Sequence, residues 1–323
     1  MNKYAPRMFE SSSIRQIIGT AESILHSGFG VVSKKINMPF VIGSMSHCAP
    51  VWDSKIAGLT AARLGCSYVD FPEEDRAMSS EDTISHLEDV CQSVDVLLTA
   101  YVDRSSFGAG HLLTEHFLSN TALPLICVRD EMFAPQPGLS ELLGLSLALH
   151  GLERRRIVIS WGFGSQFVLP STAHSLLLFA LIMGSNVRVV CPSKFPLLKR
   201  VIRQARDIAR SSGTEFEESQ EFEGSFKDAD AVFALNWCGF DDLNHPERFP
   251  AYAAEFKDWY LASGILPERC FFSSEYPVET ELLVAPPIAR GNDSVFPSWL
   301  SRRTSVLAAS IDWVLQTRGP RIG

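Results

Sequence analysis

The sequence predicts an α/β protein of two domains, each a parallel β-sheet flanked by helices, with an interdomain cleft. The first observation behind this prediction is a rhythm in which short β-branched or aromatic runs alternate with longer amphipathic stretches. The second is that the rhythm occurs twice, on either side of a continuous helical pattern at Leu139–His150 that Gly151 follows as a C-terminal cap. Strands separated by helices imply right-handed crossovers, so we expect ligands at the carboxyl ends of the strands.

The first half of the chain supplies four predicted strands, each separated from the next by a predicted helix. The strands are Pro39–Ile42, Ser67–Phe71, Val94–Ala100 and Pro124–Val128. The helices are Ile14–Ser27, Ser54–Leu64, Thr83–Cys91 and Gly110–Leu118.

The second half repeats this alternation after the Leu139–His150 helix. Its predicted strands are Arg156–Ser160, Val187–Cys191, Ala231–Ala234 and Cys270–Ser273. Its predicted helices are Thr172–Met183, Leu197–Ser211 and the terminal Trp299–Leu315, and the stretch between the third strand and Pro250 is predicted to be irregular.

Composition narrows the class of protein. The chain has 323 residues, 46% of them apolar and 20% charged, which is typical of globular proteins. Because 37 Asp and Glu outweigh 29 Lys and Arg, giving a net charge of −8 without a long basic stretch, we expect no nucleic-acid partner. The seven cysteines are dispersed and contain no C-x-x-C pair, which favours buried thiols in a reducing cytoplasm over disulfides or a metal site. No apolar run reaches membrane-spanning length and the N-terminus is polar, so we expect a cytoplasmic protein without a membrane partner, and no cofactor is indicated.

No common catalytic motif is present. A glycine-rich turn at Trp161–Ser165 follows a predicted strand, but Pro170 interrupts the path to the next helix, so nucleotide binding there is a weak hypothesis. The candidate site residues are instead those that follow predicted strands: Ser44, Ser46 and His47 in the first loop, Tyr101, Arg129, Trp161, Asn236 and Trp237. A helix start attracts anions, and a charged residue after a buried strand is often functional. The alternative interpretations are an ordinary capped loop for the first set, a surface ion pair for Arg129 and core positions for the tryptophans.

Seven segments, in this order, are similar to those of the aspartate/ornithine carbamoyltransferase family over nearly the whole chain. They are Ala57–Gly65, Arg76 with Ser79–Thr83, Ala134–Glu141, Ile157–Trp161 with Leu169-Pro170, Asp228–Val232 with Asn236-Trp237, Phe271–Pro277, and Arg303. The fourth most resembles the N-acylornithine-type branch.

The resemblance implies a transcarbamylase-like fold. It implies a carbamoyl-phosphate-type domain over residues 1–138, joined by the C-terminal helix 299–323, and an amino-acid-type domain over 139–298. It also implies a homotrimer with shared sites, in which Arg76 or Ser80 lies near a neighbouring subunit's site.

The departures from the family pattern fall on the donor side. The positions of the family's S-T-R-T-R motif are Pro50–Ser54 here, and Tyr101, Ala134, Ser274 and Glu275 replace other polar or cationic residues. Each charge-assisted hydrogen bond contributes about 1.5–3 kcal/mol, so losing several predicts poor binding of carbamoyl phosphate. His47, Arg76, Arg129 and Arg303 are candidate replacements. Glu275 would repel an anion unless Arg129 or Arg303 pairs with it.

Two functions remain open. The first is a divergent transferase that moves a carbamoyl-like group to the amine of an amino-acid-like acceptor. Its expected catalytic residues are Arg129, His47 and Glu275, and its expected substrate-binding residues are Ser44, Ser46, Trp52, Arg76, Ser80, Tyr101, Gln136, Trp161, Asn236, Trp237 and Arg303. The second is a non-catalytic member that binds a metabolite or a partner protein. Convergence of Ser46, His47, Arg129 and Glu275 on one closed pocket would favour the enzyme.

Overall fold

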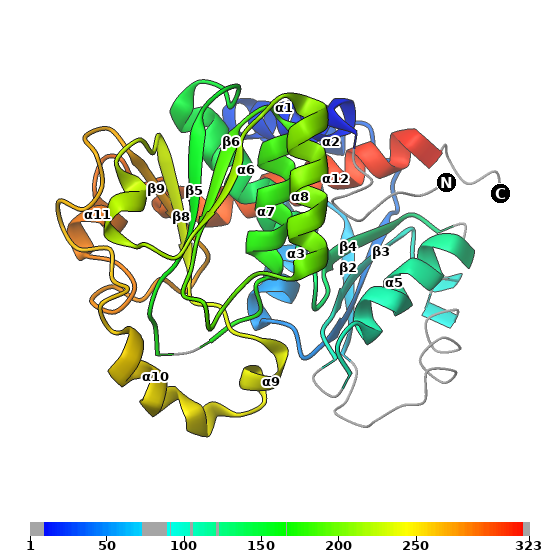
Figure 1. The fold of residues 1–323 in the computed structure, drawn as a ribbon. Helices are drawn as coiled ribbons and strands as arrows, with labels where there is room; N and C mark the ends of the chain where they lie inside the picture. Colours follow the sequence, from blue (N-terminus) through cyan, green and yellow to red (C-terminus); the bar gives the residue numbers. More distant parts are fainter. Residues whose placement is uncertain are drawn as a thin grey trace. The chain divides into compact units, whose positions relative to one another are not determined.

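The chain forms two compact units, Met1–Pro137 with Leu300–Gly323, and Gly138–Trp299. The structure is a computed structural model that describes residues 10–72, 89–90, 92–103, 106–120, 123–165 and 167–318. Figure 1 labels its helices and strands.

Unit 1 is built on a four-stranded parallel sheet of order β2-β1-β3-β4. Its strands are β1 (Val41–His47), β2 (Ser67–Pro72), β3 (Val96–Tyr101) and β4 (Leu125–Arg129). The register pairs His47 with Tyr101 and Ala100 with Arg129. The carboxyl ends of β1, β3 and β4 therefore meet at one edge of this sheet.

The helices of unit 1 include one from the far end of the chain. They are α1 (Ser11–Ser27), α2 (Gly30–Ser33), α3 (Val51–Leu64), α5 (Ala109–Asn120) and α12 (Trp299–Arg318), with α6 (Pro135–Leu149) starting at the unit boundary. Helix α3 ends at Gly65, whose φ of 77° is the left-handed conformation that glycine adopts at low cost. Helix α12 is held by Lys35, which donates to Asp312 at 2.8 Å, and by Gln136, which donates to Ser310 at 2.9 Å.

Unit 2 contains a five-stranded parallel sheet of order β7-β6-β5-β8-β9. Its strands are β5 (Arg156–Trp161), β6 (Asn186–Val190), β7 (Phe216–Ser219), β8 (Ala231–Leu235) and β9 (Phe271–Ser274). Its helices are α7 (Ser171–Ile182), α8 (Lys199–Ser212), α9 (Phe240–Leu243), α10 (Phe249–Phe256) and α11 (Pro286–Arg290), with short 3₁₀ turns at Glu223–Phe226, Pro246–Arg248 and Phe296–Ser298.

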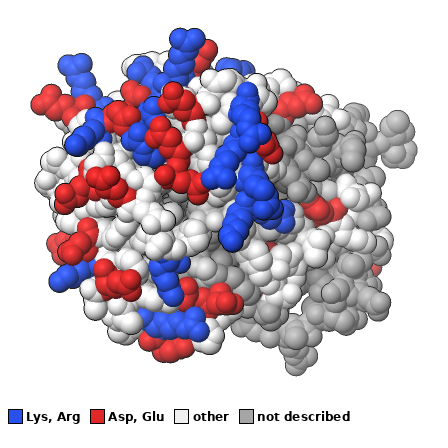
Figure 2. Space-filling view, in the orientation of Figure 1, with Lys and Arg blue, Asp and Glu red and all other residues white. Residues whose placement is uncertain are grey.

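Helices α7 and α8 of unit 2 lie side by side (Figure 1). They differ in how far their side chains are buried. Every residue of α7 from Ser171 to Leu181 is buried, as its continuous apolar run predicts. Helix α8 buries Val201, Ile202, Ala205 and Ala209. Its opposite face is basic, and Figure 2 shows a column of Lys and Arg along this helix. Helix α8 is therefore a surface helix with a charged outer stripe.

The predicted fold of two parallel sheets flanked by helices is confirmed, and most predicted elements lie within a few residues of their expected bounds. The prediction for the first strand was wrong at its end, because β1 continues to His47 and so contains Ser44 and Ser46, which were expected in a loop. Gly43 lies in this strand, and it packs so closely on Val94 that an added Cβ would lie 2.9 Å from that side chain. The predicted helix Thr83–Cys91 falls largely outside the described residues. Among the described helices, none combines the length and apolarity needed to cross a membrane.

Candidate functional site

The carboxyl edge of the unit 1 sheet brings two of the predicted residues into contact. The rings of His47 and Tyr101 stack with centroids 4.9 Å apart, as their register pairing at the ends of β1 and β3 requires. The Nε2 atom of His47 also lies 3.6 Å from Sγ of Cys48, whose backbone φ is 47°. This positive φ turns the chain from β1 toward α3, so a thiol and an imidazole share this turn.

Two predicted cations at the same edge are held by one carboxylate. Arg129, at the end of β4, donates its Nε–H to Oδ2 of Asp53 at 2.5 Å. Arg303, in α12, donates from Nη2 to Oδ1 of Asp53 at 2.7 Å. Asp53 lies in the first turn of α3, and the side chains of Asp53, Arg129 and Arg303 are 2%, 8% and 2% exposed.

Burial determines how strongly this cluster acts. Water screens exposed ion pairs to about 0–1 kcal/mol, whereas removing one partner of a buried pair costs roughly 3–5 kcal/mol because the other charge stays buried. Asp53 uses both oxygens, one for each guanidinium. The cluster is therefore a fixed part of unit 1, and neither arginine presents its charge to solvent.

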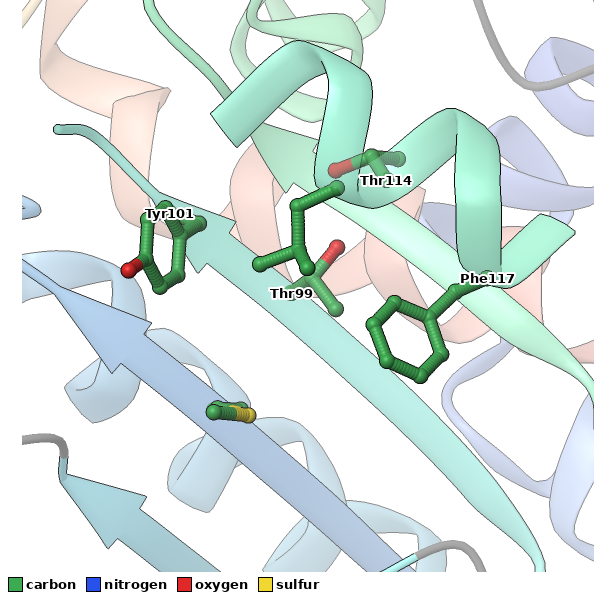
Figure 3. Close-up of a pocket in the computed structure, with 6 residues that line it drawn as sticks. Thr99, Tyr101, Thr114 and Phe117 are labelled. Carbon is green, nitrogen blue, oxygen red and sulfur yellow. The ribbon is translucent and has the colours of Figure 1, made fainter. Parts of the chain in front are cut away.

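A small pocket lies between β3 and α5. It is lined by Met45, Thr99, Tyr101, Leu113, Thr114 and Phe117. In Figure 3 Thr99 and Tyr101 come from the strand, and Thr114 and Phe117 from the helix that covers it. No lining residue carries a full charge, so this pocket does not suit an anionic or zwitterionic ligand.

The acidic residues after β4 have a structural role in this arrangement. Glu131 accepts hydrogen bonds from the backbone N–H groups of Asp103, Gly110 and His111, and so holds the start of α5. Burial nevertheless raises the pKa of Glu131 above its usual value. Asp130 bonds the His111 ring at 3.0 Å and accepts from the N–H of Phe133 at 2.7 Å. Glu131 thus holds the segment between β3 and α5, and Asp130 holds α5 and its own loop.

In unit 2 the two predicted tryptophans are core residues. Trp161 and Trp237 have no accessible surface, and Trp161 donates its indole N–H to the carbonyl oxygen of Trp237 at 2.7 Å. Trp237 donates in turn to the carbonyl oxygen of Phe195, whose ring stacks on Trp161 at 5.0 Å. Both indoles are therefore part of the unit 2 core, and their expected contact with substrate stays a prediction.

Polar groups do gather elsewhere at the carboxyl edge of the unit 2 sheet. Asn236 follows β8, and an added Cβ at Gly164 would lie 2.6 Å from its Nδ2. Glu279 accepts from the backbone N–H of Ser165 at 2.7 Å, which holds the loop after β5. Glu275, directly after β9, accepts from the Thr172 hydroxyl at 2.6 Å. Asn236 is buried and Glu275 half-buried, so Glu275 is the better placed of the two for contact with a ligand.

The thiols divide into two kinds. Burial raises the pKa of Cys66 to about 11 and those of Cys191, Cys238 and Cys270 to about 12, so these stay protonated near neutral pH. Cys48, beside His47, belongs to the accessible edge of unit 1 instead. Within the described part of the chain, no group of three His, Cys, Asp or Glu side chains is placed to hold a metal ion.

Part of unit 2 matches a known domain family. Residues 169–267 match the Asp/Orn binding domain of aspartate/ornithine carbamoyltransferase. The chain is 22% identical over 228 residues to ornithine carbamoyltransferase of Listeria innocua, with 69% of each chain covered. It is 23% identical over 153 residues to that of Picrophilus torridus, covering 47% of this chain and 49% of the relative. The alignment with Escherichia coli YgeW spans 34% of that protein, so the chain matches only about a third to a half of the length of these two relatives.

Solved structures extend the likeness to the whole fold. A crystal structure of N-acetyl-L-ornithine transcarbamylase superimposes with a TM-score of 0.84, covering 97% of this chain and 99% of that one at 15% identity. Acetylornithine transcarbamylase complexed with acetylcitrulline gives a TM-score of 0.83 with 97% and 98% covered, again at 15% identity.

Residues 169–267 thus match a domain of the aspartate/ornithine carbamoyltransferase family, and the chain as a whole shares the fold of N-acetyl-L-ornithine transcarbamylase.

The resemblance placed the family's S-T-R-T-R motif at Pro50–Ser54. In the structure this segment forms the start of α3. Pro50 is the N-cap, Val51 is exposed, and Trp52 lies under the Lys55 ammonium at 4.9 Å from the ring centroid. Asp53 is the inward-facing member of this turn. The segment where the resemblance placed that motif thus contributes a buried carboxylate in this protein.

The other predicted residues are found as follows. Ser44 is buried in β1, Ser46 is half-buried beside His47, and Gln136 is buried against Ser310. Arg76 and Ser80 lie outside the described residues. The convergence of the unit 1 residues with Glu275 on one pocket stays a prediction.

Sequence reasoning did not single out Asp53. An acidic residue in the first turn of a helix is common, because it stabilises the helix dipole, so it gave no signal of its own. Its partners are 76 and 250 residues away in the chain.

Proposed function

We propose that the protein is a carbamoyltransferase-family enzyme that transfers a carbamoyl-like group to the amine of an amino-acid-like acceptor. The match of residues 169–267 to the Asp/Orn binding domain carries the proposal, since in the family name that domain is tied to amino-acid substrates. The solved relatives named above include a complex with acetylcitrulline, a carbamoylated amino acid, which supports the same acceptor class.

The donor in this proposal differs from a free phosphate dianion. Asp53 holds both Arg129 and Arg303, so the two cations that sequence reasoning offered to a phosphate are already paired with a carboxylate. The charges of Asp53, Arg129 and Arg303 sum to +1, compared with +2 for the two guanidiniums alone. The three side chains therefore attract a phosphate dianion less strongly, and a donor whose leaving group carries less negative charge loses less of this attraction.

The residues have distinct roles in the proposed reaction. The neutral amine of the acceptor attacks the carbonyl carbon, a C–N bond forms, the bond to the leaving group breaks, and the amine loses one proton. His47, at the end of β1, accepts that proton or donates to the carbonyl oxygen as negative charge develops there. Arg129 positions the donor loop through Asp53, and Glu275 binds the acceptor's ammonium group.

The assembly and location are proposals from the same resemblance. We propose a cytoplasmic homotrimer in which Arg76 and Ser80 lie near a neighbouring subunit's site. Light scattering at micromolar concentration tests this, and a monomer would contradict the trimer and the shared site together.

The decisive experiment is a transfer assay on the full chain. Amino acids with free side-chain amines are incubated with carbamoyl phosphate or with carbamoyl esters of lower charge, and products are detected by mass spectrometry as addition of a carbamoyl group. We expect product from the less charged donors, and a loss of at least about tenfold in kcat on His47→Ala, which is typical of removing an acid–base group. The exposed variant Asp228→Asn is the control and keeps full activity. Rapid transfer from carbamoyl phosphate would show that the donor part of the proposal is wrong.

A non-catalytic binding protein is the second candidate, and the same Asp53 cluster favours it. A cluster in unit 1 in which one carboxylate pairs with both cations is also what loss of catalysis would leave, and so are tryptophans that are buried in the core of unit 2. If an amino acid stabilises the protein against unfolding and no donor yields a carbamoylated product, the non-catalytic binding protein is the better interpretation.

A further inference from the structure

A buried carboxylate lies at the point in unit 1 where positive charge is concentrated. Asp53 is the third residue of α3, and the backbone N–H groups at a helix start favour negative charge. Arg129 reaches the same point from the end of β4 and Arg303 from α12. A helix start and two guanidiniums at the carboxyl edge of a parallel sheet together form an anion-binding arrangement.

The anion held in this arrangement is a side chain of the protein itself, the Asp53 carboxylate. Asp53 contacts each arginine through a different oxygen, at 2.5 and 2.7 Å, so it binds them as a small bridging oxyanion would. Because the carboxylate is attached to the chain, its local concentration exceeds that of a free metabolite, and it requires no association step. A free anion can take the Nε–H of Arg129 and the Nη2–H of Arg303 that point to Asp53 only by displacing Asp53.

We propose that Asp53 is a specificity-determining residue, a resident anion that closes this position to phosphate-bearing ligands. Replacing it with a small neutral residue converts the position into a phosphate site held by Arg129 and Arg303. The inference deepens the proposed function, since it names the residue that selects the donor. Its test uses inorganic phosphate and no reaction, so its failure is distinct from a failure of the transfer assay.

Two variants distinguish the effect of the Asp53 charge from the effect of its side-chain volume. Asp53→Ser removes the carboxylate and opens room beside the guanidiniums, and its hydroxyl is compatible with the first turn of a helix. Asp53→Asn removes the charge and keeps the side-chain volume. Asp228→Ser is the matched control, because it changes the net charge of the chain by the same amount at an exposed position in unit 2.

The measurement is calorimetric titration of the full chain with inorganic phosphate at constant ionic strength, with chloride as the comparison anion, supported by thermal unfolding. We expect no saturable phosphate binding by the wild-type protein or by Asp228→Ser. We expect Asp53→Ser to bind phosphate at least about tenfold more tightly than either, and Asp53→Asn to bind less tightly than Asp53→Ser. Adding Arg303→Met to Asp53→Ser should abolish the gain.

The opposite results overturn the inference. Saturable phosphate binding by the wild-type protein would show that Asp53 does not close the site. Folded Asp53 variants that bind phosphate no better than Asp228→Ser would show that the cluster only ties α3 to α12. If the variants fold poorly alone, refolding yield is measured with and without phosphate. A yield that rises with phosphate but not with chloride supports the inference, and equal failure in both contradicts it, because phosphate should replace the missing carboxylate.

Discussion

Arg303 Nη2 lies 2.7 Å from Asp53 Oδ1, joining residues that are 250 positions apart in the sequence. Arg129 occupies the other oxygen of the same carboxylate. This relationship links the first helix after β1 to the last helix of the chain, and it decides which charges unit 1 presents at the carboxyl edge of its sheet.

Arg303→Met should destabilise unit 1 by about 3–5 kcal/mol, because it leaves Asp53 buried with one cation removed. The double variant with Asp53→Asn should lose less than the sum of the two single losses, by about 0.5–3 kcal/mol. Urea unfolding followed by fluorescence measures both quantities. The exposed pair Arg206 and Glu218, at 2.6 Å, is the control and should show a coupling of about 1 kcal/mol or less. Additive losses at Asp53 and Arg303 would contradict the described geometry.

Tyr252 should ionise at a higher pH than the same phenol does in the unfolded chain. Burial and its hydrogen bond to Asp242 at 2.6 Å raise its pKa from 10.0 to about 12. The unfolded phenol ionises first, so the stability that this residue contributes is complete below pH 10 and is lost as the pH rises toward 12. Alkaline titration of tyrosinate absorbance should lose its step near pH 12 in Tyr252→Phe. Loss of a step near pH 10 instead would show an ordinary exposed phenol.

Gly164→Ala should destabilise unit 2 by about 1–3 kcal/mol, the usual cost of overpacking. The added Cβ would lie 2.6 Å from Asn236 Nδ2 and 3.1 Å from Glu279 Oε1. Gly19→Ala in α1 is the control, since nothing lies within 4 Å of its Cβ position and alanine favours helix by about 0.5–1 kcal/mol. Thermal unfolding of the two variants should move in opposite directions, and equal shifts would argue against close packing at Gly164.

Cys48 should be alkylated before the other described cysteines at mildly alkaline pH. Burial raises the thiol pKa values of Cys66 and Cys191, whereas Cys48 has a neighbouring imidazole, with its Sγ 3.6 Å from His47 Nε2. Peptide mass spectrometry after brief iodoacetamide treatment gives the order of reaction. His47→Asn should slow labelling of Cys48 and leave that of Cys66 unchanged. Faster labelling at Cys191 than at Cys48 would contradict this assignment.

Much of the fold could be predicted from the sequence because local patterns specify it. The apolar run of α7 and the strand-length runs of β3, β4, β5 and β8 have clear periods, and their alternation requires parallel sheets. The edge strand β7 has the sequence Phe-Glu-Glu-Ser and no apolar run, so no local signal marked it. Helix α10 was likewise missed, within an aromatic segment that has no clear period.

The candidate site was predictable only in part. Strand ends indicated His47, Tyr101 and Arg129, and the register of the parallel sheet places all three at its carboxyl edge. The partner of Arg129 was not predictable, since Asp53 has the ordinary signature of a helix first turn. Trp161 and Trp237 are fully buried, and their contact with substrate stays a prediction, because residue type alone does not distinguish a core indole from one that contacts a ligand.

Unit 1 is built from two separate stretches of the chain, and this sets the order in which the two units are completed during synthesis. Residues 138–299 form a continuous segment, and unit 2 can therefore fold as soon as that segment leaves the ribosome. Unit 1 needs α12, so while unit 2 is being made the nascent chain holds Asp53 and Arg129 without Arg303. The half that is translated first is thus the half that is completed last, and the arrival of Arg303 marks its completion.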